Sequence, residues 1–171
     1  MPHKHKFDAL IGLLNMYHGE SEKCADASAF LGACVLLAST LEGGLLAMCY
    51  CYPEEVSGWV AGLHRRERPR GAPDAWDLGT LISLARDMKW LPAESPHPPE
   101  TIGDWVEYLR EIRNFVHPGK VLRDYGALRV EEGHLRDCEA IFEEAADWLV
   151  NKLLKDIEKA VRDKGLPSPR Y

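Results

Sequence analysis

Two arginines, an asparagine and a histidine stand close together in this chain, and they are the side chains best suited to chemistry. They are Arg110, Arg113, Asn114 and His117, followed by Pro118. Residues three or four positions apart lie on the same side of a helix, so a helix through this segment places all four together. An arginine fork binds phosphate oxygens, and an imidazole takes or gives a proton near neutral pH. The spacing therefore predicts a site that binds phosphate and moves a proton, on the last two turns of a helix that ends at the proline.

Arg113 also falls within the apolar side of this predicted helix, which suggests a second, structural role. A buried guanidinium needs an anion, and Glu42 is the one charged residue between Ala29 and Tyr52, the most apolar part of the chain. We expect Glu42 and Arg113 to form an ion pair across the fold, with removal of either partner costing about 3–5 kcal/mol. Arg110 is then the better phosphate ligand, because Arg113 is already paired with Glu42.

The hydrophobic pattern is helical almost throughout and predicts an all-α fold, a bundle of four to six helices in a single domain over residues 1–171. Asp77 and Thr101 have side chains suited to cap the start of a helix, and residues 164–171 are expected to form a flexible tail. The expected helices cover 7–18, 27–52, 78–91, 102–117 and 135–161, with a polar break at 21–26, proline-rich connections at 58–73 and 92–99, and a long loop at 120–133.

The apolar segment 27–52 is long enough to span a membrane. It carries Glu42 near its centre, together with Ser39, Thr40 and two glycines, and it lacks flanking tryptophan or a Lys/Arg bias. A helix that is apolar on all sides is also what the middle of a bundle requires. We interpret the segment as a buried central helix, and we expect no membrane partner.

Net charge and cysteine content argue against some classes of function. A formal net charge of −6 argues against broad, non-specific nucleic-acid binding, which needs a basic surface. The local basic patch at residues 64–70 is interpreted as a solvated loop. The five cysteines include no CxxC pair and no zinc-like spacing. We expect reduced thiols, a cytoplasmic location, and neither a metal nor another cofactor.

The segment from Leu109 to Lys120 resembles the signature of HEPN domains, α-helical proteins common in prokaryotic defence and toxin–antitoxin systems. Their motif is an arginine, a short spacer and a histidine, with a polar residue, often asparagine, directly after the arginine. Here Arg113 is followed by the asparagine, and Arg110 stands at the family's longer spacing from His117. The helical layout is also similar, with a long apolar second helix and the motif near the end of a later one.

This resemblance implies a metal-independent endoribonuclease, or a relative that binds RNA or a nucleotide, working as a homodimer whose two motifs meet at one site. On that basis His117 is the acid or base, since an ordinary imidazole pKa of about 6.5 suits proton transfer near neutral pH. Arg110 or Arg113 is the phosphate ligand, and Asn114 is the orienting amide.

Four further side chains near the motif bear on RNA binding and on what covers the motif helix. Lys120 and Arg123, just past the motif, are expected to extend a basic rim for RNA. Tyr108 and Phe115 lie on the helix side opposite the apolar one, so either a loop or a second subunit related by two-fold symmetry covers them.

The alternative function belongs to another class. It is a non-catalytic helical interaction module that binds a partner protein. In it Arg113 and Glu42 only hold the fold together, and His117 occupies a helix end that favours it electrostatically.

Overall fold

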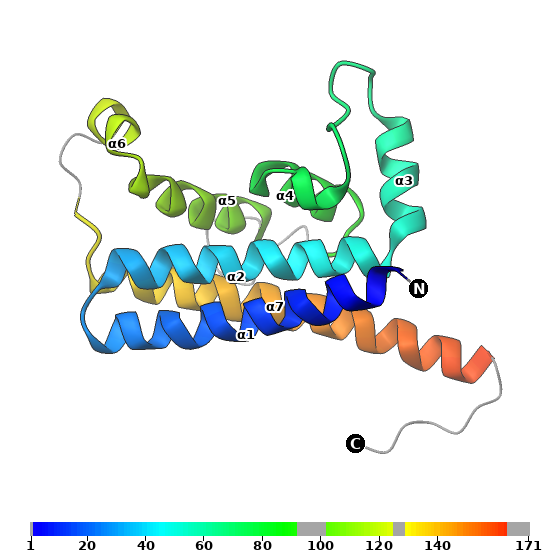
Figure 1. Ribbon diagram of the computed structural model, residues 1–171, viewed down its shortest axis with the longest axis horizontal. Helices are drawn as coiled ribbons and strands as arrows, with labels where there is room; N and C mark the ends of the chain where they lie inside the picture. Colours follow the sequence, from blue (N-terminus) through cyan, green and yellow to red (C-terminus); the bar gives the residue numbers. More distant parts are fainter. Residues whose placement is uncertain (1, 92–101, 125–128, 164–171) are drawn as a thin grey trace.

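The protein is described from a computed structural model, which defines residues 2–91, 102–124 and 129–163. Within these ranges every regular element is helical, so the all-α prediction is confirmed (Figure 1). The helices are α1 (Pro2–Asp26), α2 (Phe30–Cys51), α3 (Pro53–Gly62), α4 (Leu78–Asp87), α5 (Ile102–Arg113), α6 (Pro118–Asp124) and α7 (Glu132–Asp163), with 3₁₀ turns η1 (Pro73–Ala75) and η2 (Asn114–Val116).

The central helix is α2, which packs against α1 and α7 on one side and against α4 and α5 on the other (Figure 1). It is apolar all round because neighbours surround it, and Leu37, Leu41 and Leu45 are almost fully buried. By length and composition alone α2 could cross a membrane, and half of its most apolar stretch is buried inside the protein.

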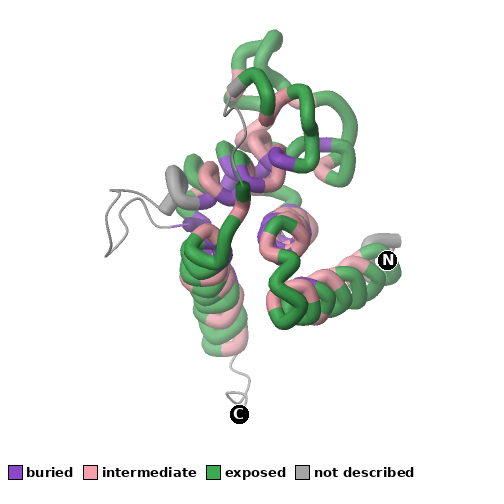
Figure 2. Tube along the Cα trace, turned by 90° about the vertical axis from the view of Figure 1, so that its left-hand side faces the viewer, coloured by how far each residue is buried: buried purple, intermediate pink, exposed green. Residues whose placement is uncertain are grey.

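Burial is concentrated where α2 meets α4, α5 and α7, while α1 lies at the outside of the fold (Figure 2). The first helix rests on α2 through a close approach at Gly43, where a Cβ atom would overlap the side chain of Leu14. The chain reverses between these two helices at Ser28, which takes a φ of 57°. The two helices therefore form an antiparallel pair that leaves the other face of α2 to hold the candidate site.

The start of α4 is fixed by its cap. Asp77 Oδ1 accepts a hydrogen bond of 2.7 Å from the backbone N–H of Thr80, as the sequence predicts. The far end of this helix is tied to α3, because Trp59 Nε1 donates to Asp87 at 2.7 Å. These contacts hold α4 across the face of the molecule, with its N-terminus beside α5.

Several predicted boundaries are wrong, mostly for one reason. Pro53 and Pro118 each stand just after the end of a helical element, as the sequence predicts, but each also takes the first position of a further helix, where its missing N–H costs nothing. As a result α3 and α6 replace parts of the expected loops at 58–73 and 120–133, and seven α-helices are found in the described ranges rather than four to six.

The first helix is also longer than predicted, because the polar segment 21–26 is helical, and α7 extends past both of its expected ends. Thr101, the 92–99 connection and the 164–171 tail lie outside the described residues.

Candidate functional site

The backbone turns sharply at the motif instead of continuing as one helix. The regular part of α5 ends at Arg113, η2 follows, and His117 is extended with φ −100° and ψ 95°. The His117 N–H donates to the carbonyl of Asn114 at 2.9 Å, and its own carbonyl accepts from Lys120 and Val121 at 3.0 and 3.1 Å. His117 is thus fastened on both sides, between the 3₁₀ turn and the start of α6.

This turn brings the predicted site residues to one place. Arg110, Arg113, Asn114 and His117 all line a single surface groove of about 550 Å³. The side chain of His117 is exposed, and the two arginines and the asparagine are half-buried. An imidazole that solvent can reach and a nearby guanidinium therefore share one groove, which acid–base chemistry on a phosphate requires.

The opposite wall of the groove comes from residues that the motif does not include. Ser39 of α2 lines it, together with Asp77 and Gly79 at the start of α4. The Ser39 hydroxyl donates to the carbonyl of Val35 at 2.9 Å, one turn earlier in the same helix. No local sequence signal places these residues beside the motif, because the contact depends on how α4 packs across α2 and α5.

Arg113 and Glu42 form the ion pair expected between α2 and α5, with Arg113 Nη1 2.5 Å from Glu42 Oε2. Their side chains remain 36% and 24% exposed, so the pair is shielded less than predicted. Burial raises the pKa of Glu42 above its usual value, and Asp77 raises it further, while Arg113 lowers it. Because the net pKa shift is upward, the loss of hydration outweighs the attraction of the guanidinium.

Arg110 is less completely satisfied than Arg113. Its Nη2 forms an ion pair with Glu107, one turn earlier in α5. Its Nε–H is buried and has no hydrogen-bond acceptor among the described residues. The arginine also lies against Gly79, since a Cβ at that position would be 3.6 Å from Arg110 Cδ. A glycine here lets the arginine stem cross the first turn of α4 closely.

The charges around the groove are nearly balanced. Asp77 is held ionised, because hydrogen bonds from Thr80 and the nearby Arg110 keep its pKa low. Asp77, Glu42 and Glu107 therefore offset the two arginines. Arg110 can take a phosphate if it exchanges its contact with Glu107 for a phosphate oxygen, so access to this arginine decides what the groove can bind.

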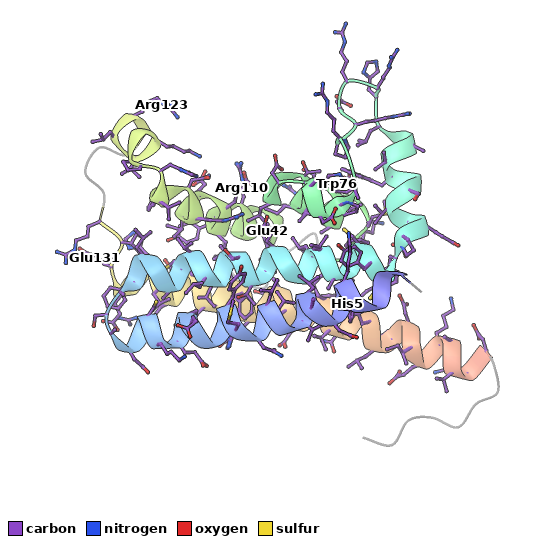
Figure 3. All side chains as sticks on the ribbon, viewed as in Figure 1. His5, Glu42, Trp76, Arg110, Arg123 and Glu131 are labelled. Carbon is purple, nitrogen blue, oxygen red and sulfur yellow. The ribbon has the colours of Figure 1, made fainter. Side chains whose placement is uncertain are left out.

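The structure does not bring all predicted residues into the groove. Lys120 and Arg123 lie on α6, outside the groove lining, and Figure 3 shows Arg123 at the far end of that helix, away from Arg110. Phe115 is 9% exposed and Tyr108 is half-buried, both packed with the core of their own chain. These two aromatic side chains therefore give no separate support for a dimer.

In the described part of the chain, no group of three or more histidine, cysteine or acidic side chains is arranged to hold a metal ion. Comparison with protein-family models, curated proteins and solved structures finds no match to this chain. The geometry of the groove is therefore the structural feature that bears on function.

Proposed function

We propose that this protein is a HEPN-like, metal-independent endoribonuclease that binds and cuts RNA at the groove between α4 and α5. The single observation that supports this is the shared position of an exposed His117 and the incompletely satisfied Arg110 in one groove. A homodimer and a role in defence or toxin–antitoxin systems belong to the same proposal on the motif resemblance alone, and a cytoplasmic location belongs to it on the cysteine pattern.

The chemistry follows from these two groups. His117 takes the proton of an RNA 2′-hydroxyl, and the 2′-oxygen then bonds to the adjacent phosphorus. The bond from phosphorus to the 5′-oxygen breaks, which leaves a 2′,3′-cyclic phosphate. The departing 5′-oxygen receives a proton from His117 of the partner subunit in the proposed dimer. Arg110 stabilises the charge that builds on the phosphate oxygens, and Asn114 orients the phosphate.

A second candidate is a non-catalytic interaction module, and one observation favours it. Each motif arginine already has a carboxylate partner, with Arg110 bound to Glu107 and Arg113 bound to Glu42. Under this alternative Arg113 ties α5 to α2 through Glu42, Arg110 stays paired with Glu107 on its own helix, and the groove binds no phosphate.

The deciding experiment is RNA cleavage in EDTA by the purified protein and by His117→Ala. The matched control is His5→Ala, an exposed histidine on α1, far from Arg110 (Figure 3). We expect the wild type and His5→Ala to give equal rates and products ending in cyclic phosphate, and His117→Ala to lose at least about 100-fold in rate. Equal cleavage by all three proteins would show that the activity does not depend on His117 and would remove the catalytic proposal.

A further inference from the structure

The connection from α3 to η1 carries a dense group of positive charges that the groove does not use. We call residues 63–72 the basic loop. It holds His64 and four arginines, and Glu67 is its one acidic residue. In a chain with a net charge of −6, these cations make the loop a local centre of positive charge, which attracts an anionic partner.

One arginine of the basic loop has a structural task. Arg68 donates from Nη2 to the carbonyl of Ala61 at 2.8 Å and from Nε to the carbonyl of Leu63 at 3.1 Å. Ala61 lies in the last turn of α3 and Leu63 directly follows the helix, where carbonyls lack partners within the helix. Arg68 therefore caps α3 and fixes the start of the loop.

The rest of the loop is also held in one shape. The Glu67 N–H donates to the carbonyl of His64 at 2.8 Å, which closes a turn. At the far end, Trp76 Nε1 donates to the carbonyl of Gly71 at 3.3 Å, and Gly71 takes a φ of 78° that suits glycine. The loop thus presents its remaining cations from an ordered backbone, which lowers the entropy lost on binding.

Three arginines of the loop are left for an outside partner. Arg65, Arg66 and Arg70 are exposed, and no carboxylate pairs with them among the residues that the structure describes. The arginines of the groove differ, because each has a carboxylate partner.

The basic loop lies on the same side of α2 as the groove. It projects beyond the bundle on the α4 and α5 side, whereas α1 and α7 occupy the other side (Figure 1). From the loop the chain passes through η1 directly to Asp77 and Gly79, which form one wall of the groove. One extended polyanionic chain can therefore contact both the basic loop and the groove along this face.

We propose that the basic loop binds the phosphate backbone of single-stranded RNA outside the cleavage groove, through Arg65, Arg66 and Arg70. The identification of the ligand as RNA rests on the proposed function, whereas the anionic character of the ligand rests on the loop alone. Guanidinium forks match phosphate oxygens and bind them without regard to base sequence. None of the exposed large apolar side chains in the described ranges belongs to this loop, which disfavours insertion into a lipid surface.

The test measures binding separately from cleavage. A fluorescein-labelled 2′-O-methyl oligouridine cannot be cut by 2′-hydroxyl attack, so its anisotropy reports binding at several salt concentrations. The test variant combines Arg65→Ala, Arg66→Ala and Arg70→Ala and keeps Arg68, so that the cap on α3 remains. The matched control makes the same change in charge on α7, with Lys155→Ala, Lys159→Ala and Arg162→Ala, three exposed positions.

We expect the loop variant to bind about tenfold or more weakly at low salt. We also expect the plot of log affinity against log salt concentration to become shallower, with the magnitude of its slope smaller by about 2. Each lost phosphate contact on a single strand reduces that magnitude by about 0.7. The α7 control should bind as the wild type does, and both variants should keep the wild-type thermal midpoint. Equal weakening in both variants would show that only net charge matters and would overturn the proposal.

Two other outcomes separate this inference from the proposed function. Loss of binding in the loop variant supports the basic loop as an RNA-binding surface even if His117→Ala cleaves as the wild type does. Unchanged binding in the loop variant, with cleavage lost in His117→Ala, overturns the loop proposal and leaves the enzyme. Stronger loop-dependent binding to phosphatidylserine vesicles than to the oligouridine would also overturn it.

Discussion

The ion pair between Glu42 and Arg113 shows how partial exposure to solvent changes what a charged residue contributes to the free energy of unfolding. For a fully buried pair, the loss of one partner costs about 3–5 kcal/mol, which is the value expected from the sequence. Exposed pairs contribute about 0–1 kcal/mol. With side chains 36% and 24% exposed, this pair lies between the two cases, and we expect Arg113→Gln to cost about 1–2 kcal/mol at neutral pH.

The raised pKa of Glu42 predicts an unusual pH dependence for Glu42→Gln. Burial makes the folded protein hold the Glu42 proton more tightly than the unfolded chain does, where the pKa is near 4.5. This contribution to stability is complete below pH 4.5 and is lost as pH rises through the folded-state pKa. The free energy of unfolding of Glu42→Gln, measured by urea titration, should therefore increase relative to that of the wild type as pH rises above 4.5.

The opposite trend would contradict this account of Glu42. If Glu42→Gln loses stability relative to wild type as pH rises, then the attraction of Arg113 outweighs the cost of burial. Glu111→Gln is the control, because Glu111 is exposed on α5 and removes the same charge. A pH trend of the same size in both variants would show that the trend comes from the loss of one negative charge and not from the burial of Glu42.

The site could be predicted from the sequence only in part, for a physical reason. Arg110, Arg113, Asn114 and His117 are near one another in the chain, so local geometry brings them together even though η2 breaks the helix. Ser39, Asp77 and Gly79 enter the groove from other helices. Their positions depend on how helices pack, and local periodicity does not specify that packing.

At the scale of helices, the sequence pattern identified the long apolar α2 and the cap at Asp77 correctly. It placed helix ends before Pro53 and Pro118 but missed α3 and α6, because a proline that ends one helix can equally begin the next. Both prolines follow the preceding helical element after a single residue, Tyr52 or His117. The sharp turn at His117 is what exposes its imidazole, so the boundary that was predicted wrongly is also the one that forms the site.

The neighbouring glycines of α2 provide a test of how α1 packs on it. A Cβ at Gly43 would overlap Leu14 of α1, whereas a Cβ at Gly44 would meet Leu149 Cδ1 of α7 at an ordinary 3.7 Å. Alanine favours a helix over glycine by about 1 kcal/mol, and overpacking costs about 1–3 kcal/mol. We expect Gly44→Ala to stabilise the protein by up to about 1 kcal/mol and Gly43→Ala to be less stable than Gly44→Ala by about 1–3 kcal/mol in urea unfolding.

The double variant Gly43→Ala with Leu14→Ala is the control for this packing. Removing the side chain that the new methyl group meets should make the effect of Gly43→Ala more favourable than it is in the wild-type background. Equal stability for the two single glycine variants would show that α1 does not approach α2 as closely as described.

For the molecule as a whole, the cysteines report whether α2 is enclosed by the other helices. Cys51 is exposed, whereas Cys34, Cys49 and Cys138 are at most 3% exposed. Burial raises the pKa of Cys51 and raises that of Cys49 to about 12, and the thiolate is the form that reacts, so the exposure of Cys51 is what makes it the more accessible of the two. With Ellman's reagent we expect Cys51 to react first in the native protein and all five thiols to react in urea.

The variant Cys51→Ser is the control and should remove the fast phase. Fast reaction of Cys34, Cys49 or Cys138 in the native protein would mean that α2 is not enclosed in the way the structure shows. That result would also count against the described shape of the groove, because Ser39 of α2 lines the groove and Glu42 of α2 pairs with Arg113.

If His117 and Arg110 contact the same phosphate, a phosphate ligand must change the proton NMR signals of the His117 imidazole. Uridine 3′-monophosphate is titrated into wild type, Arg110→Gln and Glu107→Gln, with His117→Ala to assign the resonance. The account predicts a saturable shift of the imidazole protons in wild type, its loss in Arg110→Gln, and tighter binding in Glu107→Gln, where the arginine is released from its carboxylate. An imidazole signal that does not move, or that moves equally without Arg110, would contradict it.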